Sequence, residues 1–134
     1  MATLMKLDIN TRHLINLNQV TGHIEPNLFT IKHHNRINIH DIKNQYLTSD
    51  TFYNNGNSIG SDIHWHNTPE SRIILIGVAT FYIPTENYLY VAECEPFDEI
   101  QIEAKVKHWF RSHGQLLVYR FFKSLDGHVS LFDN

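Results

Sequence analysis

His64, His66 and Glu70 are the side chains in this sequence whose types and spacing best suit metal chemistry. In a strand, residues two apart point to the same face, so both imidazoles would project together. The turn-forming residues 67–69 would bring the carboxylate of Glu70 back toward them. Two imidazoles and one carboxylate are a common ligand set for non-haem iron and similar divalent ions. The alternative is a chance grouping, because the chain contains ten histidines.

A fourth candidate ligand lies in residues 99–110, where apolar and polar side chains alternate strictly. The alternation predicts one strand, in which His108 shares a face with Val106 and Phe110. A lone histidine on such a face is more often a hydrogen-bonded core residue than a ligand. Beside the other three candidates, His108 would instead complete a four-ligand set that leaves two adjacent positions of an octahedral ion open. Open positions suit catalysis rather than a structural metal.

Composition narrows the class of protein. A chain of 134 residues with 42% hydrophobic and 12% aromatic content is typical of one packed globular domain. The formal net charge is −3 and no run of Lys or Arg occurs, so nothing indicates binding to nucleic acid or to an anionic membrane. Cys94 is the single cysteine, which excludes an intrachain disulfide and indicates a reducing compartment. No signal peptide or membrane-length apolar run is present, so we expect a soluble cytoplasmic protein.

The elements that would position these residues are strands. Residues 54–61 are expected to form a loop, residues 84–87 a turn, and Asp126-Gly127 a two-residue hairpin. A bulge or bend is expected at Gly77. We expect residues 1–27 to form an irregular N-terminal arm, containing at most one helix or an edge strand, and residues 28–134 to form the barrel of a single domain. Strands are expected at residues 28–42, 46–53, 72–83, 88–94, 99–110, 115–123 and 128–132. Short strands at this spacing predict an antiparallel sandwich or barrel.

At this point a family resemblance emerges. His64, His66, Glu70 and Gly77 match the pattern H-x-H-x3-E-x6-G, which is similar to the first signature of the cupin superfamily. His108 corresponds to the histidine of the second signature. The stretch YLYVAECEPFDEIQIEAKVKHWF, followed by VYRFF and DGHVSLF, resembles the acireductone dioxygenase family of the methionine salvage pathway. The resemblance covers about residues 60–134.

The resemblance implies an all-β fold, a cupin-type antiparallel jelly-roll barrel with little helix. It implies a divalent metal, Fe(II) or Ni(II), that is held by His64, His66, Glu70 and His108. The substrates would be O2 and an acireductone, an enediol-ketone that binds the metal as an anion. By position, the family's active-site arginines correspond to Arg72 and Arg120, a pocket aromatic to Phe110, and a residue that lines the substrate's tail to His128. Because cupins often pair into dimers, a homodimer is a further possibility.

Two departures from the family pattern bear on the chemistry. Ile63 stands where the family has a glutamate thought to deprotonate the substrate, so Asp62 or another group would have to act as the base, or the chemistry differs. His128 stands where the family has a tryptophan. Two alternatives to the dioxygenase therefore remain open. One is a cupin that binds a small molecule or metal without turnover, and the other is a cupin isomerase or cyclase that uses the same metal site.

Overall fold

The computed structural model describes residues 2–20, 23–25, 27–54, 62–127 and 129–132. Within these residues the chain is built almost entirely of strands and carries one short helix, α1 (Ile39–Lys43). The strands are β1 (Ala2–Asp8), β2 (Leu14–Val20), β3 (His23–Glu25), β4 (Phe29–His33), β5 (Thr48–Asn54), β6 (Glu70–Ile76), β7 (Ala79–Pro84), β8 (Tyr88–Cys94), β9 (Asp98–Ile102), β10 (Trp109–Ser112) and β11 (Leu116–Phe122).

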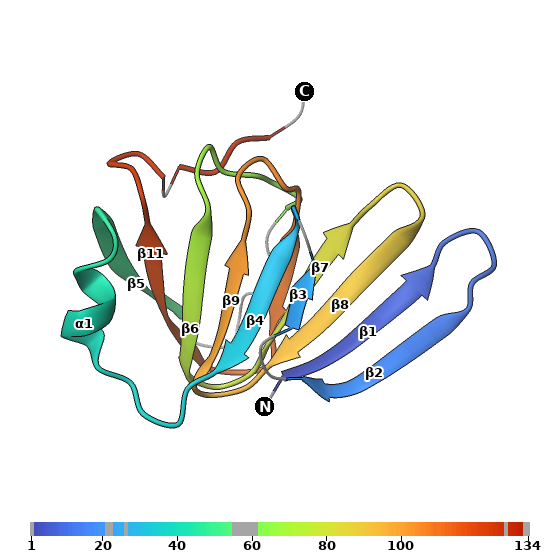
Figure 1. Ribbon diagram of the computed structural model, residues 1–134, viewed down its shortest axis with the longest axis horizontal. Helices are drawn as coiled ribbons and strands as arrows, with labels where there is room; N and C mark the ends of the chain where they lie inside the picture. Colours follow the sequence, from blue (N-terminus) through green and yellow to red (C-terminus); the bar gives the residue numbers. More distant parts are fainter. Residues whose placement is uncertain (1, 21–22, 26, 55–61, 128, 133–134) are drawn as a thin grey trace.

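Two antiparallel sheets form the barrel. One sheet has the order β10-β7-β8-β1-β2, and the other has the order β3-β4-β9-β6-β11-β5. Figure 1 shows the second sheet curving round one side of the molecule, with α1 outside it beside β11 and β5. This arrangement confirms the expected all-β, antiparallel barrel with little helix.

Apolar side chains from both sheets meet in one core. Buried Leu4 and Phe81 come from the first sheet, and Phe29, Ile74 and Val118 come from the second. Cys94 is also fully buried in this core, as expected for a small hydrophobic side chain, and burial raises the pKa of its thiol. In the described part of the chain, no helix is both long and apolar enough to cross a membrane.

The N-terminal residues are more regular than the sequence indicates. β1 lies between β2 and β8, where it pairs with both in antiparallel register, so the expectation of an irregular arm is wrong. An edge strand was among the expectations for this region, and β2 occupies that place. The apolar residues of β1 show no clean period in the sequence because only Ala2 and Leu4 are fully buried.

Two long expected strands are each interrupted. Of residues 28–42, only Phe29–His33 form a strand, and α1 follows because the side chain of Asn38 accepts hydrogen bonds from the N–H groups of His40 and Asp41. This N-cap outweighs the β-branched composition of the segment. Residues 99–110 divide into β9 and β10, which lie in different sheets. Between them Lys105 has φ = 65°, which breaks the strand that the alternation predicts.

The other expectations divide as follows. Residues 72–83 do break at Gly77, where φ is 90° and the chain passes from β6 in one sheet to β7 in the other. The strands expected at 46–53, 88–94 and 115–123 are present as β5, β8 and β11. A hairpin at Asp126-Gly127 is not formed, because Leu131 instead forms an isolated bridge with Trp65. The expected loop at 54–61 falls outside the described residues from position 55 onward.

Candidate metal centre

Three buried histidines meet at one end of the barrel. His64 and His108 form an isolated antiparallel bridge, in which each residue donates its N–H to the other's carbonyl at 3.0 and 2.9 Å. His66 is two residues further along the same segment and therefore projects to the same side as His64. The nitrogen atoms that the three rings can offer to a metal all lie within 4.8 Å of one another.

Glu70 brings a carboxylate to the same point from the first position of β6. Its Oε2 lies 2.8 Å from Nε2 of His66, and its Oε1 lies 3.9 Å from Nε2 of His108. The side chain is only 1% exposed. The structure therefore brings together all four side chains that the sequence singles out as ligands.

The ring orientation of each histidine is set by a backbone carbonyl. Nδ1 of His64 lies 2.8 Å from the carbonyl of Asp62, and Nδ1 of His108 lies 2.9 Å from that of Val106. Nδ1 of His66 lies 2.9 Å from the carbonyl of Gly127 and 3.0 Å from that of Val129. A carbonyl can only accept, so in each ring Nδ1 carries the proton. The Nε2 lone pairs are thus left for a ligand, as in most histidine metal sites.

The buried polar atoms at the centre fit a metal ion. Nε2 of His66, Nε2 of His108 and Oε2 of Glu70 have no hydrogen-bond partner in the structure. Buried polar atoms without partners are costly, and here they are lone pairs that face one another. A cation among them removes that cost. The separation of 2.8 Å between His66 and Glu70 is close to the spacing of about 3 Å between neighbouring ligand atoms bound at about 2.1 Å from an ion.

Electrostatics keep the ligands in their binding forms. Burial lowers the pKa of His64, and it lowers the pKa of His108 to about 3 against the opposing charge of Glu70. Burial alone would raise the pKa of Glu70, but the Arg72 guanidinium and His66 outweigh it and hold that pKa well below its usual range. At neutral pH the site therefore presents neutral imidazoles at positions 64 and 108 and an ionised carboxylate.

Arg72 and Phe110 extend the site into the barrel. Nε of Arg72 forms an ion pair with Oε1 of Glu70, and the guanidinium lies over the ring of Phe110 at 5.0 Å. Arg72 is 4% exposed and Phe110 is 7% exposed. Phe110 in turn packs edge-on against Phe52 of β5, with ring centroids 5.6 Å apart. Both residues that the sequence proposed for this part of the site thus lie beside the histidine cluster.

Arg120 has a partner that the sequence did not indicate. Its Nε and Nη2 donate to the two carboxylate oxygens of Asp50 at 2.7 and 2.6 Å. The guanidinium lies 5.6 Å from the ring of Phe122, and that ring lies 5.8 Å from the ring of His66. The ring of Phe122 therefore lies between Arg120 and His66, and two donors of Arg120 are already engaged by Asp50.

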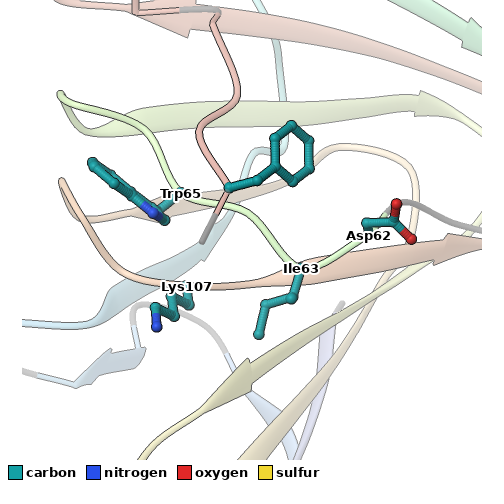
Figure 2. A pocket seen from close by; sticks show the side chains of 5 residues that line it. Asp62, Ile63, Trp65 and Lys107 are labelled. Carbon is teal, nitrogen blue, oxygen red and sulfur yellow. The ribbon is translucent and has the colours of Figure 1, made fainter. Parts of the chain in front are cut away.

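Ile63 and Asp62 line a cleft, together with Trp65, Lys107 and Phe132. None of these residues is a candidate ligand. Asp62, Ile63, Trp65 and Lys107 (Figure 2) are, however, each within two positions of a candidate histidine in the sequence. The cleft has a volume of about 390 Å³. Ile63 is 46% exposed, whereas His64 beside it is 3% exposed. Position 63, where the related family has the glutamate thought to deprotonate the substrate, is thus open to solvent.

Among the histidines that the structure describes, no other joins the cluster. His33 and His34 are half-buried and contact the carboxylates of Asp98 and Glu99, each at 2.8 Å. His128 falls outside the described residues. Sequence reasoning also missed Asp50, Phe52 and the carbonyls that hold His66. Strand register places Asp50 opposite Arg120 and Leu131 opposite Trp65. Register leaves no signal in the local sequence, so neither contact could be predicted.

Part of the chain is similar in sequence to acireductone dioxygenases. The chain is 37% identical over 71 residues to an acireductone dioxygenase from Hydrogenobaculum and 32% identical over 73 residues to one from Pseudomonas paraeruginosa. These segments cover 52% and 53% of this chain, and the chain spans only 39–40% of the length of these curated relatives. No protein-family model matches the chain.

Among solved structures, an acireductone dioxygenase from Bacillus anthracis with a cadmium ion in its active centre has a TM-score of 0.71 at 17% identity. The similarity covers 98% of this chain and 99% of that one. A mutant of oxalate decarboxylase from Bacillus subtilis has a TM-score of 0.53 at 19% identity, over 84% of this chain and 30% of that one. The cupin-type jelly-roll fold and the resemblance to acireductone dioxygenases are thereby confirmed.

Proposed function

We propose that this protein is a metal-dependent dioxygenase that cleaves an acireductone, or a similar enediol, with O2. The observation that carries the proposal is the buried cluster of His64, His66 and His108, with the Glu70 carboxylate beside His66 and His108 and with unpartnered polar atoms facing one another. Three imidazoles and one carboxylate would hold Fe(II) or Ni(II), and Co(II) or Mn(II) would also fit this ligand set. The partial sequence similarity to acireductone dioxygenases supports the choice of substrate.

A metal ion bound there would act as a Lewis acid toward the oxygen atoms of an enediolate and would bring O2 close to it. The residues around it have separate tasks. Arg72 keeps Glu70 ionised through their ion pair, and its other N–H groups are donors for an anionic substrate. Phe110 and Phe52 form an apolar surface beside Arg72, which would keep water away from a bound anion. Arg120 adds a second cation, whose strength is moderated by Asp50.

The proton of the enediol limits the substrate class. Glu70 is paired with Arg72, and the side chains of Asp62 and Ile63 line the solvent-exposed cleft. We therefore favour a substrate that is already an anion at neutral pH, which needs no base from the protein. For the same reason the second candidate is a cupin that binds a small anionic molecule at its metal without turnover.

A two-step experiment tests the proposal. Metal content of the purified protein is measured first, with His64→Ala as the comparison. Oxygen uptake and product formation are then followed with an acireductone after loading with Fe(II) or Ni(II). Near-stoichiometric metal and substrate-dependent oxygen uptake are expected. Metal binding and substrate binding without oxygen uptake would favour the non-catalytic alternative, and absence of metal binding would overturn both.

The same proposal places the protein in methionine salvage, because the acireductone dioxygenase family that it resembles belongs to that pathway. A cytoplasmic location is proposed from the single, buried Cys94. A homodimer is also proposed, and light scattering of the metal-loaded protein tests it.

A further inference from the structure

Each histidine of the candidate centre donates from Nδ1 to a backbone carbonyl, and these carbonyls differ in their distance along the sequence from the histidine. His64 and His108 are each held by the carbonyl two residues before them. His66 is held by carbonyls that lie 61 and 63 residues further on, those of Gly127 and Val129. The support of His66 therefore exists only when the chain after β11 returns to the site.

That returning segment, Gly127 together with residues 129–132, is here named the C-terminal strap. It is fastened to the ligand segment by two backbone hydrogen bonds, from the N–H of Trp65 to the carbonyl of Leu131 at 3.0 Å and in reverse at 2.9 Å. Trp65 is the residue before His66, so the strap holds both the backbone and the ring of this ligand. In Figure 1 the strap runs across the upper ends of β11, β6 and β9.

Gly127 is the point where the strap comes closest to the barrel. A Cβ atom at this position would lie 2.7 Å from Cβ of Phe122 and 2.8 Å from Oγ1 of Thr68. Cβ of Phe122 is fixed by β11 and cannot move aside without the strand. Phe122 also packs on His66, with ring centroids 5.8 Å apart. Any side chain at position 127 would therefore push the strap, and the carbonyls that support His66, away from the ring.

We propose that Gly127 is a positioning residue for His66: the absence of a side chain lets the strap reach the ring and fix its proton on Nδ1. With that proton held, Nε2 of His66 keeps its lone pair toward Glu70 and His108. The inference rests on the proposed metal centre and identifies what keeps one of its ligands in the binding form. The strap thereby couples the order of the C-terminal segment to metal affinity.

The test uses Gly127→Ala in the full chain and Co(II) as the probe. Loss of such a support typically weakens metal binding about 10- to 100-fold, so a rise of that size in the Co(II) dissociation constant is expected, with a changed visible spectrum. The matched control is Gly114→Ala. Gly114 has φ = 88° but no atom within 4 Å of an added Cβ, so this change strains the backbone without touching the site.

Imidazole ¹⁵N NMR of the metal-free protein gives an independent reading. The wild type is expected to carry the His66 proton on Nδ1, and Gly127→Ala to show a mixture of both tautomers. Should Gly127→Ala not fold, Leu131→Pro removes the hydrogen bond to the carbonyl of Trp65 and is expected to act in the same direction.

The outcomes separate the two proposals. If the wild type does not bind Co(II), the proposed function fails, and the tautomer of His66 still decides the role of the strap. If the wild type binds Co(II) and Gly127→Ala binds within twofold of Gly114→Ala, the proposed role of Gly127 is overturned. A wild-type His66 that carries its proton on Nε2 overturns it as well.

Discussion

Arg120 lies directly opposite Arg72 where β11 pairs with β6, and Asp50 lies opposite Arg120 where β5 pairs with β11. One carboxylate and two guanidinium groups thus occupy a row across three strands. Like charges at facing positions destabilise a sheet unless they are balanced. Asp50 balances Arg120, and Glu70 balances Arg72. The two arginines can therefore face each other in the sheet.

The first prediction concerns this row. Asp50→Asn releases Arg120, so the Michaelis constant for an anionic enediol is expected to fall, whereas Arg120→Gln is expected to raise it about tenfold. The cost of Asp50→Asn in unfolding free energy is expected to be about 1 kcal/mol or less, because the Asp50 side chain is 40% exposed. Steady-state oxygen uptake and urea unfolding measure both quantities. Equal Michaelis constants in the two variants would contradict a role for Arg120 toward the substrate.

The second prediction concerns Glu70. Glu70→Gln removes a ligand charge and leaves Arg72, which is 4% exposed, without its carboxylate. Bound metal after dialysis is expected to fall below about a tenth of the wild-type amount. The metal-free protein is expected to lose about 3–5 kcal/mol, the usual cost of breaking a buried ion pair. Glu86→Gln, in an exposed turn, is the control. Full metal content in Glu70→Gln would contradict the ligand set.

The third prediction concerns Gly77, the last residue of the sequence signature. A Cβ at Gly77 would lie 2.0 Å from the carbonyl oxygen of Gln115, and φ is 90°. Gly77→Ala is therefore expected to destabilise the protein by more than about 2 kcal/mol. Gly114→Ala, which has a similar φ but open space, is expected to cost about 1 kcal/mol. Similar losses in the two variants would show that the contact with Gln115 relaxes.

The sequence predicted which side chains lie close together better than it predicted the strands that carry them. Alternation in residues 99–110 correctly placed His108 on a buried face, yet the same alternation concealed the turn at Lys105. Asn38 followed by Asp41 is a recognisable start of a helix, and in the folded chain this cap outweighs the strand preference of the isoleucines around it. Local propensity could have identified α1, but not the break between β9 and β10.

What the sequence could not provide are the contacts set by register. Asp50 meets Arg120 because β5 pairs with β11 in one particular alignment, and a shift by one residue would turn Asp50 to the other face. The carbonyl of Gly127 reaches His66 only because the chain after β11 leaves the sheet instead of forming a hairpin. These long-range contacts surround the candidate ligands, which is why the sequence indicates a metal site more readily than the shape of the substrate pocket.

The fourth prediction concerns the missing base. The side chain of Ile63 lines the cleft described above and is 46% exposed. Ile63→Glu is therefore expected to change metal content and the rate of oxygen uptake by less than about twofold, with Asp62→Asn as a comparison in the same cleft. A rise of tenfold or more in Ile63→Glu would show that position 63 reaches the substrate, and would point to deprotonation as the step this chain lacks.

The fifth prediction is the acid sensitivity of the metal-free protein. Folding lowers the pKa values of His64 and His108, that of His108 to about 3. Between about pH 3 and the ordinary histidine pKa of about 6.5, His108 therefore binds a proton in the unfolded chain but not in the folded chain. Stability is therefore full above about pH 6.5 and falls as the pH drops, by about 1.4 kcal/mol per pH unit through His108, while His64 adds to the loss in the same direction. Below the ordinary glutamate value of about 4.5, the lowered pKa of Glu70 adds to the loss in the same direction. Urea unfolding between pH 7 and pH 4 measures this slope. His108→Gln is expected to flatten it, whereas His13→Gln, at an exposed position, is expected to leave it unchanged. An equally steep slope in His108→Gln would mean that other groups govern the response to acid.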